Sequence, residues 1–133
     1  MKLDKLSPRL AANSPATLHL KDPATGERLF DGKTPVSMEI LGADSDALEV
    51  KQKDIASRQL AGENISEAQS GAEMLASITV GWTGIGLHSD EELPFTFENA
   101  VRLYLDKDSE WICGQVGPFS RDRKNFVTNR QKH

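Results

Sequence analysis

The sequence is poor in the residues on which many catalytic and metal sites depend. It holds one cysteine, Cys113, and three scattered histidines, His19, His88 and His133. A single thiol cannot form an internal disulfide, and no group of Cys and His has the spacing of zinc ligands. This residue usage fits a reducing cytoplasm and argues against a disulfide-bonded domain or a zinc site.

Long apolar runs and an excess of basic charge are also missing. No apolar stretch approaches the roughly 18 residues that a membrane helix needs. Residues 1–6 contain two lysines but no apolar stretch behind them, so we expect neither a secretory signal nor membrane association. The 20 acids and 16 bases give a net charge of −4, which argues against nucleic-acid binding as the main task.

What remains is the composition of a soluble globular domain. The 133 residues are 38% hydrophobic and 27% charged, enough for one domain with a modest core. We expect an α+β fold in which a short N-terminal antiparallel β element, residues 16–41, precedes about four α-helices in residues 45–127. These two parts form a single domain, 16–127, between a flexible arm at 1–15 and a basic tail at 128–133.

The β element is indicated by alternation of apolar and polar residues. Residues 17–21 and 36–41 alternate with a period of two, as half-buried strands do. Residues 28–30 are a candidate for a short strand between them. The segments 22–26 and 31–35 contain the proline, glycine and aspartate that favour turns. This small sheet must rest on the helical part to be stable.

Two helices are expected directly after the β element. Residues 46–60 are rich in helix formers, and Asp44 or Ser45 is placed to accept an unpaired backbone N–H as N-cap. A second helix is expected over about 64–81, with one apolar stripe at three-four spacing. The stripe consists of Ala68, Ala72, Leu75, Ile78 and Trp82.

Two further helices are expected after a glycine-rich link. Thr96 is the expected N-cap of one, and Ser109 that of the last. The apolar stripe of the last helix keeps its phase across residues 117–118, Gly-Pro, which predicts a kinked helix because proline removes one backbone hydrogen bond. That stripe consists of Ile112, Val116, Phe119 and Phe126.

Three motifs resemble functional sites but lack the residues that those sites require. The Gly-Ile-Gly of residues 84–86 has Ser89 where a dinucleotide-binding loop needs its third glycine. The Asp-Ser-Asp of residues 44–46 is followed by Leu48 and Glu49, where a calcium loop has a ligand and a glycine. Cys113 has no histidine near it in sequence, so a semi-buried position explains it better than a nucleophile does. We therefore predict no catalytic, cofactor-binding or metal-binding residue and no enzymatic activity.

Charge is distributed unevenly along the chain. Residues 121–133 carry a net charge of +4, so the other 120 residues carry −8. A basic tail of this kind either stays solvated or contacts an acidic partner or nucleic acid. Phe126 is the one aromatic residue in it, so support for single-strand binding is weak.

A set of short motifs in fixed order carries a resemblance to a known family. In the second half of the chain the motifs are residues 82–85 (WTGI), 93–96 (LPFT), 98–100 (ENA), 103–104 (LY), 111–112 (WI), 115–116 (QV), Phe119, 122–123 (DR) and 125–126 (NF). They resemble the carboxyl half of the tail assembly chaperones of long-tailed, siphovirus-type bacteriophages. Residues 20–27 (LKDPATGE) and 42–45 (GADS) resemble the amino-terminal β portion of that family. The resemblance spans about 16–127, and the Gly-Pro at 117–118 departs from the smooth helix of the family.

The resemblance implies a non-enzymatic assembly factor. Such a chaperone binds the tape measure protein, keeps its long helix soluble and helps to recruit tail tube subunits. It acts in the cytoplasm of the infected or lysogenic bacterial host and is absent from the mature virion. Many members are also made as a longer product by translational frameshifting. Self-association of this chain is left open.

Partner contact requires apolar or charged surface, and the sequence offers more large apolar residues than a small core obviously needs. The competing interpretation is that these residues are the core. The candidate contact residues are Trp82, Ile85, Leu87, Arg123, Lys124 and Phe126. Two alternatives to a chaperone stay open: a structural neck or tail-completion subunit of the phage particle, and a nucleic-acid-binding regulator that uses the basic tail.

Overall fold

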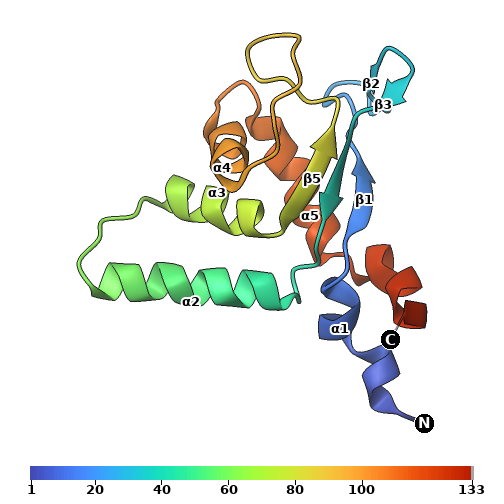
Figure 1. Cartoon of the computed structure of the whole chain (residues 1–133), viewed down its shortest axis with the longest axis vertical. Coiled ribbons are helices and arrows are strands. Elements are labelled where there is room, and N and C mark those ends of the chain that lie inside the picture. Colours follow the sequence, from blue (N-terminus) through green and yellow to red (C-terminus); the bar gives the residue numbers. More distant parts are fainter. Residues whose placement is uncertain (133) are drawn as a thin grey trace.

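Three antiparallel strands form the main sheet of the protein. The computed structural model describes residues 1–132, and side chains as far as residue 130. The strands are β1 (Ala16–His19), β4 (Ser37–Ile40) and β5 (Thr79–Thr83), in the order β1-β4-β5 (Figure 1). A separate two-stranded ribbon pairs β2 (Phe30–Asp31) with β3 (Thr34–Pro35). The expected α+β class is confirmed.

Five α-helices and three 3₁₀ helices complete the described part of the chain. The α-helices are α1 (Pro8–Ala12), α2 (Asp46–Leu60), α3 (Glu67–Ser77), α4 (Phe97–Leu105) and α5 (Cys113–Arg121). The 3₁₀ helices are η1 (Leu3–Leu6), η2 (Glu110–Ile112) and η3 (Arg123–Lys132). The predicted helix at 46–60 is confirmed to the residue.

One face of the sheet packs against helices to form the core. Met38 and Ile40 on β4 are fully buried, whereas Ser37 and Glu39, which alternate with them, retain exposure. The main core cluster consists of Leu20, Met38, Ile40, Ala72, Ala76, Ile78, Ile85, Ala100, Leu103, Tyr104, Ile112 and Val116. It joins β4 to α3, α4 and α5, so the sheet rests on the helices as its size requires.

The predicted second helix is too long, and its end is a strand. Helix α3 ends at Ser77, and the chain continues as β5, in which Trp82 lies opposite Met38 of β4. Thr79, Val80 and Thr83 are β-branched and suit a strand, and pairing with β4 supplies partners for the backbone of this segment. The sheet is therefore not confined to the N-terminal element: its third strand comes from between two helices.

Helices also replace the expected loose arm at residues 1–15. The Ser7 hydroxyl accepts the Leu10 N–H and caps α1, and Pro8 takes the first helical position, where its missing N–H costs nothing. Helix α1 packs against η3. There the amide of Asn129 donates to the Ala11 carbonyl at 3.0 Å, in a buried position. The two ends of the described chain therefore lie side by side (Figure 1).

The N-caps are partly those expected from the sequence. The Thr96 hydroxyl accepts the Asn99 N–H at 3.0 Å and caps α4 as predicted. Ser45 precedes α2, but neither it nor Asp44 accepts a cap hydrogen bond; instead Asn13, 33 residues away, accepts the Asp46 N–H at 2.8 Å. Likewise, Ser109 precedes η2 without a side-chain cap.

Helix α5 contains Pro118 and ends at Arg121, and the chain then turns into η3. The rings of Phe119 and Phe126 meet edge to face with centroids 5.9 Å apart across this turn. The expected single kinked helix is therefore wrong: Ile112 lies on η2, Val116 and Phe119 lie on α5, and Phe126 lies on η3.

Candidate protein-binding groove

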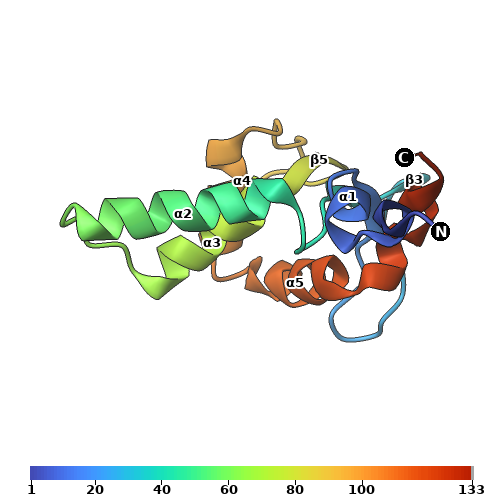
Figure 2. The ribbon, with the colours of Figure 1, turned by 90° about the horizontal axis from the view of Figure 1, so that it is seen from below.

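Helices α3 and α5, with the start of α2, enclose an open apolar groove of about 460 Å³. Seen from below, α5 runs beside α2 and α3 (Figure 2). The large side chains in the groove come from all three elements: Leu48 from α2, Met74 and Leu75 from α3, Ile78 from the end of α3, and Cys113 from α5. Ile78 is fully buried, whereas the other four are half-buried and keep apolar surface uncovered. Contiguous uncovered apolar surface of this kind is typical of interaction sites.

Glycines line both walls of the groove. Gly71 lies on α3, and Gly114 and Gly117 lie on α5. A Cβ atom built at Gly71 or Gly114 would meet no atom within 4 Å. Glycine inside a helix destabilises it by about 0.5–1 kcal/mol relative to alanine, and no crowding within the chain requires glycine at these two positions.

Cys113 contributes a protonated thiol to the groove. Its Sγ lies 3.6 Å from the Tyr104 carbonyl oxygen, to which the thiol donates. Burial raises the pKa of the Cys113 thiol, and the nearby Glu110 carboxylate adds to this effect. Since a nucleophilic cysteine needs a lowered pKa or a paired base, this cysteine acts as a lining group.

One charged side chain borders the groove. Arg121, at the end of α5, is exposed and is the only charged residue among those that line it. Within the described residues Arg121 makes no ion pair, whereas Arg123, two positions later, pairs with Asp44 at 2.8 Å. The groove is thus apolar, with one guanidinium at its rim, that of Arg121, which is unpaired among the described residues.

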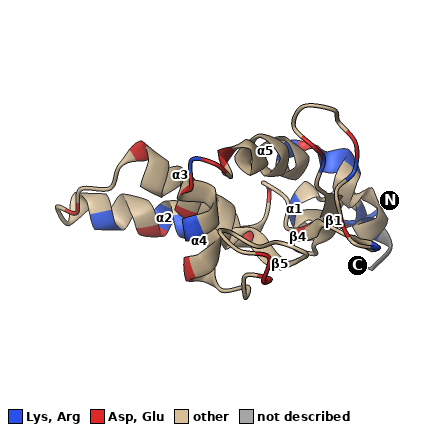
Figure 3. Ribbon diagram, turned by 90° about the horizontal axis from the view of Figure 1, so that it is seen from above, with Lys and Arg blue, Asp and Glu red and all other residues tan. Residues whose placement is uncertain are grey.

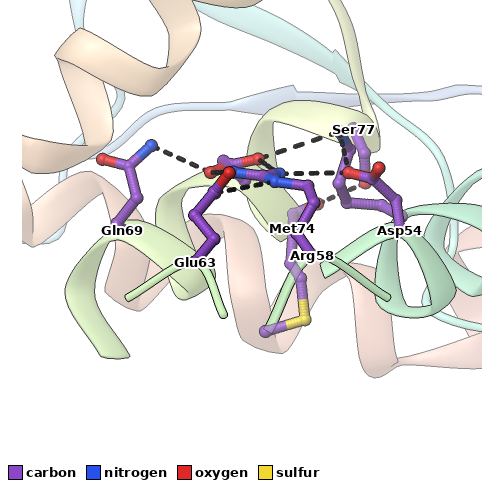
Figure 4. A network of polar contacts seen from close by, with 8 residues as sticks. Asp54, Arg58, Glu63, Gln69, Met74 and Ser77 are labelled. Atoms are coloured by element: carbon purple, nitrogen blue, oxygen red, sulfur yellow. Dashed lines mark hydrogen bonds and ion pairs between the residues drawn. The ribbon is translucent and has the colours of Figure 1, made fainter. Parts of the chain in front are cut away.

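A partly buried ionic network holds α2 against α3 (Figure 4). The Glu73 side chain is 6% exposed, and both its oxygens accept from Arg58, at 2.7 and 3.1 Å. Gln69 donates to Glu73 at 2.9 Å, and Arg58 also pairs with Asp54 and Glu63. The Arg58 guanidinium lowers the pKa of Glu73 to about 2, against the opposing effect of burial. The carboxylate therefore stays ionised at neutral pH.

Three of the predicted contact residues lie on β5 and the loop that follows it. Trp82 is half-buried, its indole N–H donates to the Leu93 carbonyl at 2.7 Å, and its ring meets Phe95 edge to face at 4.9 Å. Ile85 is 5% exposed and belongs to the core, so its prediction as a contact residue is corrected. Leu87 is half-buried and packs against the core cluster.

The other three lie at the opposite end of the molecule (Figure 1). Arg123 is exposed and paired with Asp44, and Lys124 is exposed. Phe126 is 2% exposed, which corrects its prediction as a contact residue. The structure therefore does not bring the two predicted sets together. Sequence reasoning missed the groove between α3 and α5, although the glycines at 71, 114 and 117 inside helical patterns were a signal.

Basic residues lie on both segments where the two ends of the chain meet (Figure 3). Two of them are neutralised, since Arg9 pairs with Asp46 at 3.0 Å and Arg123 pairs with Asp44. Four have no ion pair within the described residues: Lys2, Lys5, Lys124 and Arg130. The basic tail and the N-terminal segment thus share one surface.

Comparisons with known proteins add no relative: no family model, curated protein or solved structure matches this chain. Among the described residues, no group of three or more His, Cys, Asp or Glu is placed to hold a metal ion. Nor does that part of the chain contain a helix with the length and apolar character to span a bilayer.

Proposed function

We propose that this protein is a tail assembly chaperone of a long-tailed bacteriophage. In this role it binds the tape measure protein without chemical transformation and helps to recruit tail tube subunits in the cytoplasm of the bacterial host. The resemblance of residues 16–127 to that family supports the proposal. The structural observation that carries it is the unfilled apolar groove between α3 and α5.

A tape measure protein is a very long helix with apolar stretches that must be covered before the tail tube surrounds it. An amphipathic helix is commonly bound by laying its apolar side chains into a groove between other helices. Leu48, Met74 and Leu75 offer such a surface, because each is only half-buried in this chain alone. A second partner, such as a tail tube subunit, requires a different surface, for which the half-buried Trp82 and Leu87 remain candidates.

Coexpression tests the proposal. The chain is produced together with a tape measure protein of the same phage, and the soluble fraction of that protein is measured with and without the chaperone candidate. We expect a clear increase in solubility and copurification of the two proteins. Equal aggregation in both cultures would refute the proposal. Copurification of the chain with mature virions would also contradict it and would favour a structural neck or tail-completion subunit.

A further inference from the structure

We propose that the groove between α3 and α5 binds one amphipathic helix of a partner protein, oriented by an Asp or Glu of that helix that pairs with Arg121. The choice of a protein helix as occupant rests on the proposed function. The location and the charge requirement rest on the geometry of the groove.

The size and walls of the groove suit a helix. A helix presents three to four apolar residues in about two turns, and a groove of about 460 Å³ has room for side chains of that number and kind. Gly71 on one wall and Gly114 on the other place no side chain between the occupant and the two helix backbones. Close approach of another backbone is a recurrent use of glycine.

Charge complementarity selects an acidic group in the occupant. Arg121 is exposed at the rim, where its guanidinium lies over Gly117, and like Arg28, Arg102 and Arg130 it has no ion pair within the described residues. A guanidinium can bind a carboxylate through two parallel hydrogen bonds, which would fix the direction of the bound helix in the groove and add to its affinity.

Helix α2 of a second copy of the chain does not supply a suitable apolar stripe. The exposed large apolar residues of α2 are Val50 and Leu60, at 67% and 90% exposure. They are ten positions apart, about 15 Å along the axis, and so do not form the compact stripe that fills two turns. A different protein is the occupant that the proposed function supplies.

A designed peptide tests the groove directly with the full-length chain. The probe is a capped, leucine-striped helical peptide with one Glu at the edge of the stripe, and its controls are the same peptide with Lys in place of Glu and a scrambled sequence. Binding is measured by fluorescence anisotropy and by protection of Cys113, which lines the groove, from a maleimide reagent. We expect the Glu peptide to bind and to slow modification of Cys113, and the scrambled peptide to do neither.

Charge reversal tests the role of Arg121. The variant Arg121→Glu is expected to bind the Glu peptide with about tenfold lower affinity, which is the loss for an ion pair worth about 1.4 kcal/mol. It is expected to bind the Lys peptide more tightly than the wild type does. Equal affinity of both peptides for both proteins would overturn the charge requirement.

Filling the groove tests its location. The variants Gly71→Leu and Gly114→Leu place apolar side chains where no atom lies within 4 Å of a built Cβ, so they are expected to fold and to lose about tenfold or more in peptide affinity. The matched control is Ala56→Leu, which adds the same side chain to an exposed position of α2 outside the groove. Circular dichroism confirms the fold of each variant. Unchanged peptide binding in the two groove variants would overturn the inference.

The outcomes separate this inference from the proposed function. If the groove variants solubilise the tape measure protein as well as the wild type does, the docking site is elsewhere and the proposed function stands. If the peptide binds the groove but the wild-type chain does not solubilise the tape measure protein, the proposed function fails and the groove remains a helix-binding site. Binding of a small apolar dye at Cys113 without binding of the peptide would identify a small-molecule pocket and refute the helix.

Discussion

Removal of the charge on Glu73 is expected to destabilise the protein by about 2 kcal/mol. The Glu73 side chain is 6% exposed and accepts two hydrogen bonds from Arg58 and one from Gln69. Loss of one partner of a buried ion pair costs about 3–5 kcal/mol when the other charge is left uncompensated. In the variant Glu73→Gln, however, Arg58 is 31% exposed and keeps Asp54 and Glu63, so the expected cost lies below that range.

The same network predicts a stability loss in acid. Since the pKa of Glu73 is lowered from 4.5 to about 2 in the folded protein, the folded state holds its proton less tightly than the unfolded state does. The contribution of Glu73 is therefore fully present above pH 4.5 and disappears as the pH falls through about 2. The variant Glu73→Gln lacks this group, so its stability should fall less steeply over that interval.

Urea denaturation at pH 7 and at several values between pH 2 and 5 measures both effects. A loss of about 2 kcal/mol corresponds to a decrease of about 8 °C in the melting temperature of a domain of this size. The matched control is Glu49→Gln, which removes an exposed ion pair with Lys53 and should change stability by less than about 0.5 kcal/mol. Equal stability of Glu73→Gln and wild type at pH 7, or parallel pH profiles, would refute the reasoning.

The remaining predictions concern packing, the groove and the basic surface. Gly42→Ala should destabilise the protein by about 1–3 kcal/mol in urea denaturation, because its Cβ would lie 2.5 Å from a side chain of α1. An unchanged denaturation midpoint would show that α1 shifts to make room for the added methyl group. Gly71→Ala should raise stability by about 0.5–1 kcal/mol, and a loss would mean that the groove is narrower than described. Cys113 should react with a maleimide more slowly than free cysteine at pH 7 and accelerate on unfolding, since burial raises its pKa; equal rates would contradict this. For nucleic acid, Lys124→Glu should weaken any salt-dependent DNA binding and lower its salt dependence without unfolding, because Lys124 is exposed and makes no ion pair within the described residues; unchanged affinity and salt dependence would place the contact elsewhere.

A deletion of residues 121–133 is a poor test of DNA binding. Phe126 and Asn129 of η3 are buried, and Asn129 bonds to the carbonyls of Ala11 and Ser14. Such a deletion would expose α1 and the end of α5 together with removing the charge. Single charge reversals on exposed positions leave this packing in place and isolate the electrostatic effect.

The sequence by itself determined the features that depend on neighbouring residues. Local propensities account for the bounds of α2 and for the capping of α4 by Thr96. The turns at Gly26 and Gly32 have φ values of 77° and 63°, which are backbone conformations that glycine tolerates. The alternation in β4 also follows from the sequence, because Met38 and Ile40 lie on one face of any strand that contains them.

Only the tertiary structure decided which segments meet. Residues 79–83 became β5 because β4 offered an edge with unpaired backbone groups, an outcome that helical spacing of apolar residues cannot reveal. Asn13 capped α2, and α1 covered η3, across separations of 33 and more than 100 residues. The placement of the helices over the sheet also decided that Ile85 and Phe126 are buried, since an apolar residue looks the same in the sequence whether it lies in a core or at a binding surface. The same placement left the groove open beside Gly71 and Gly114.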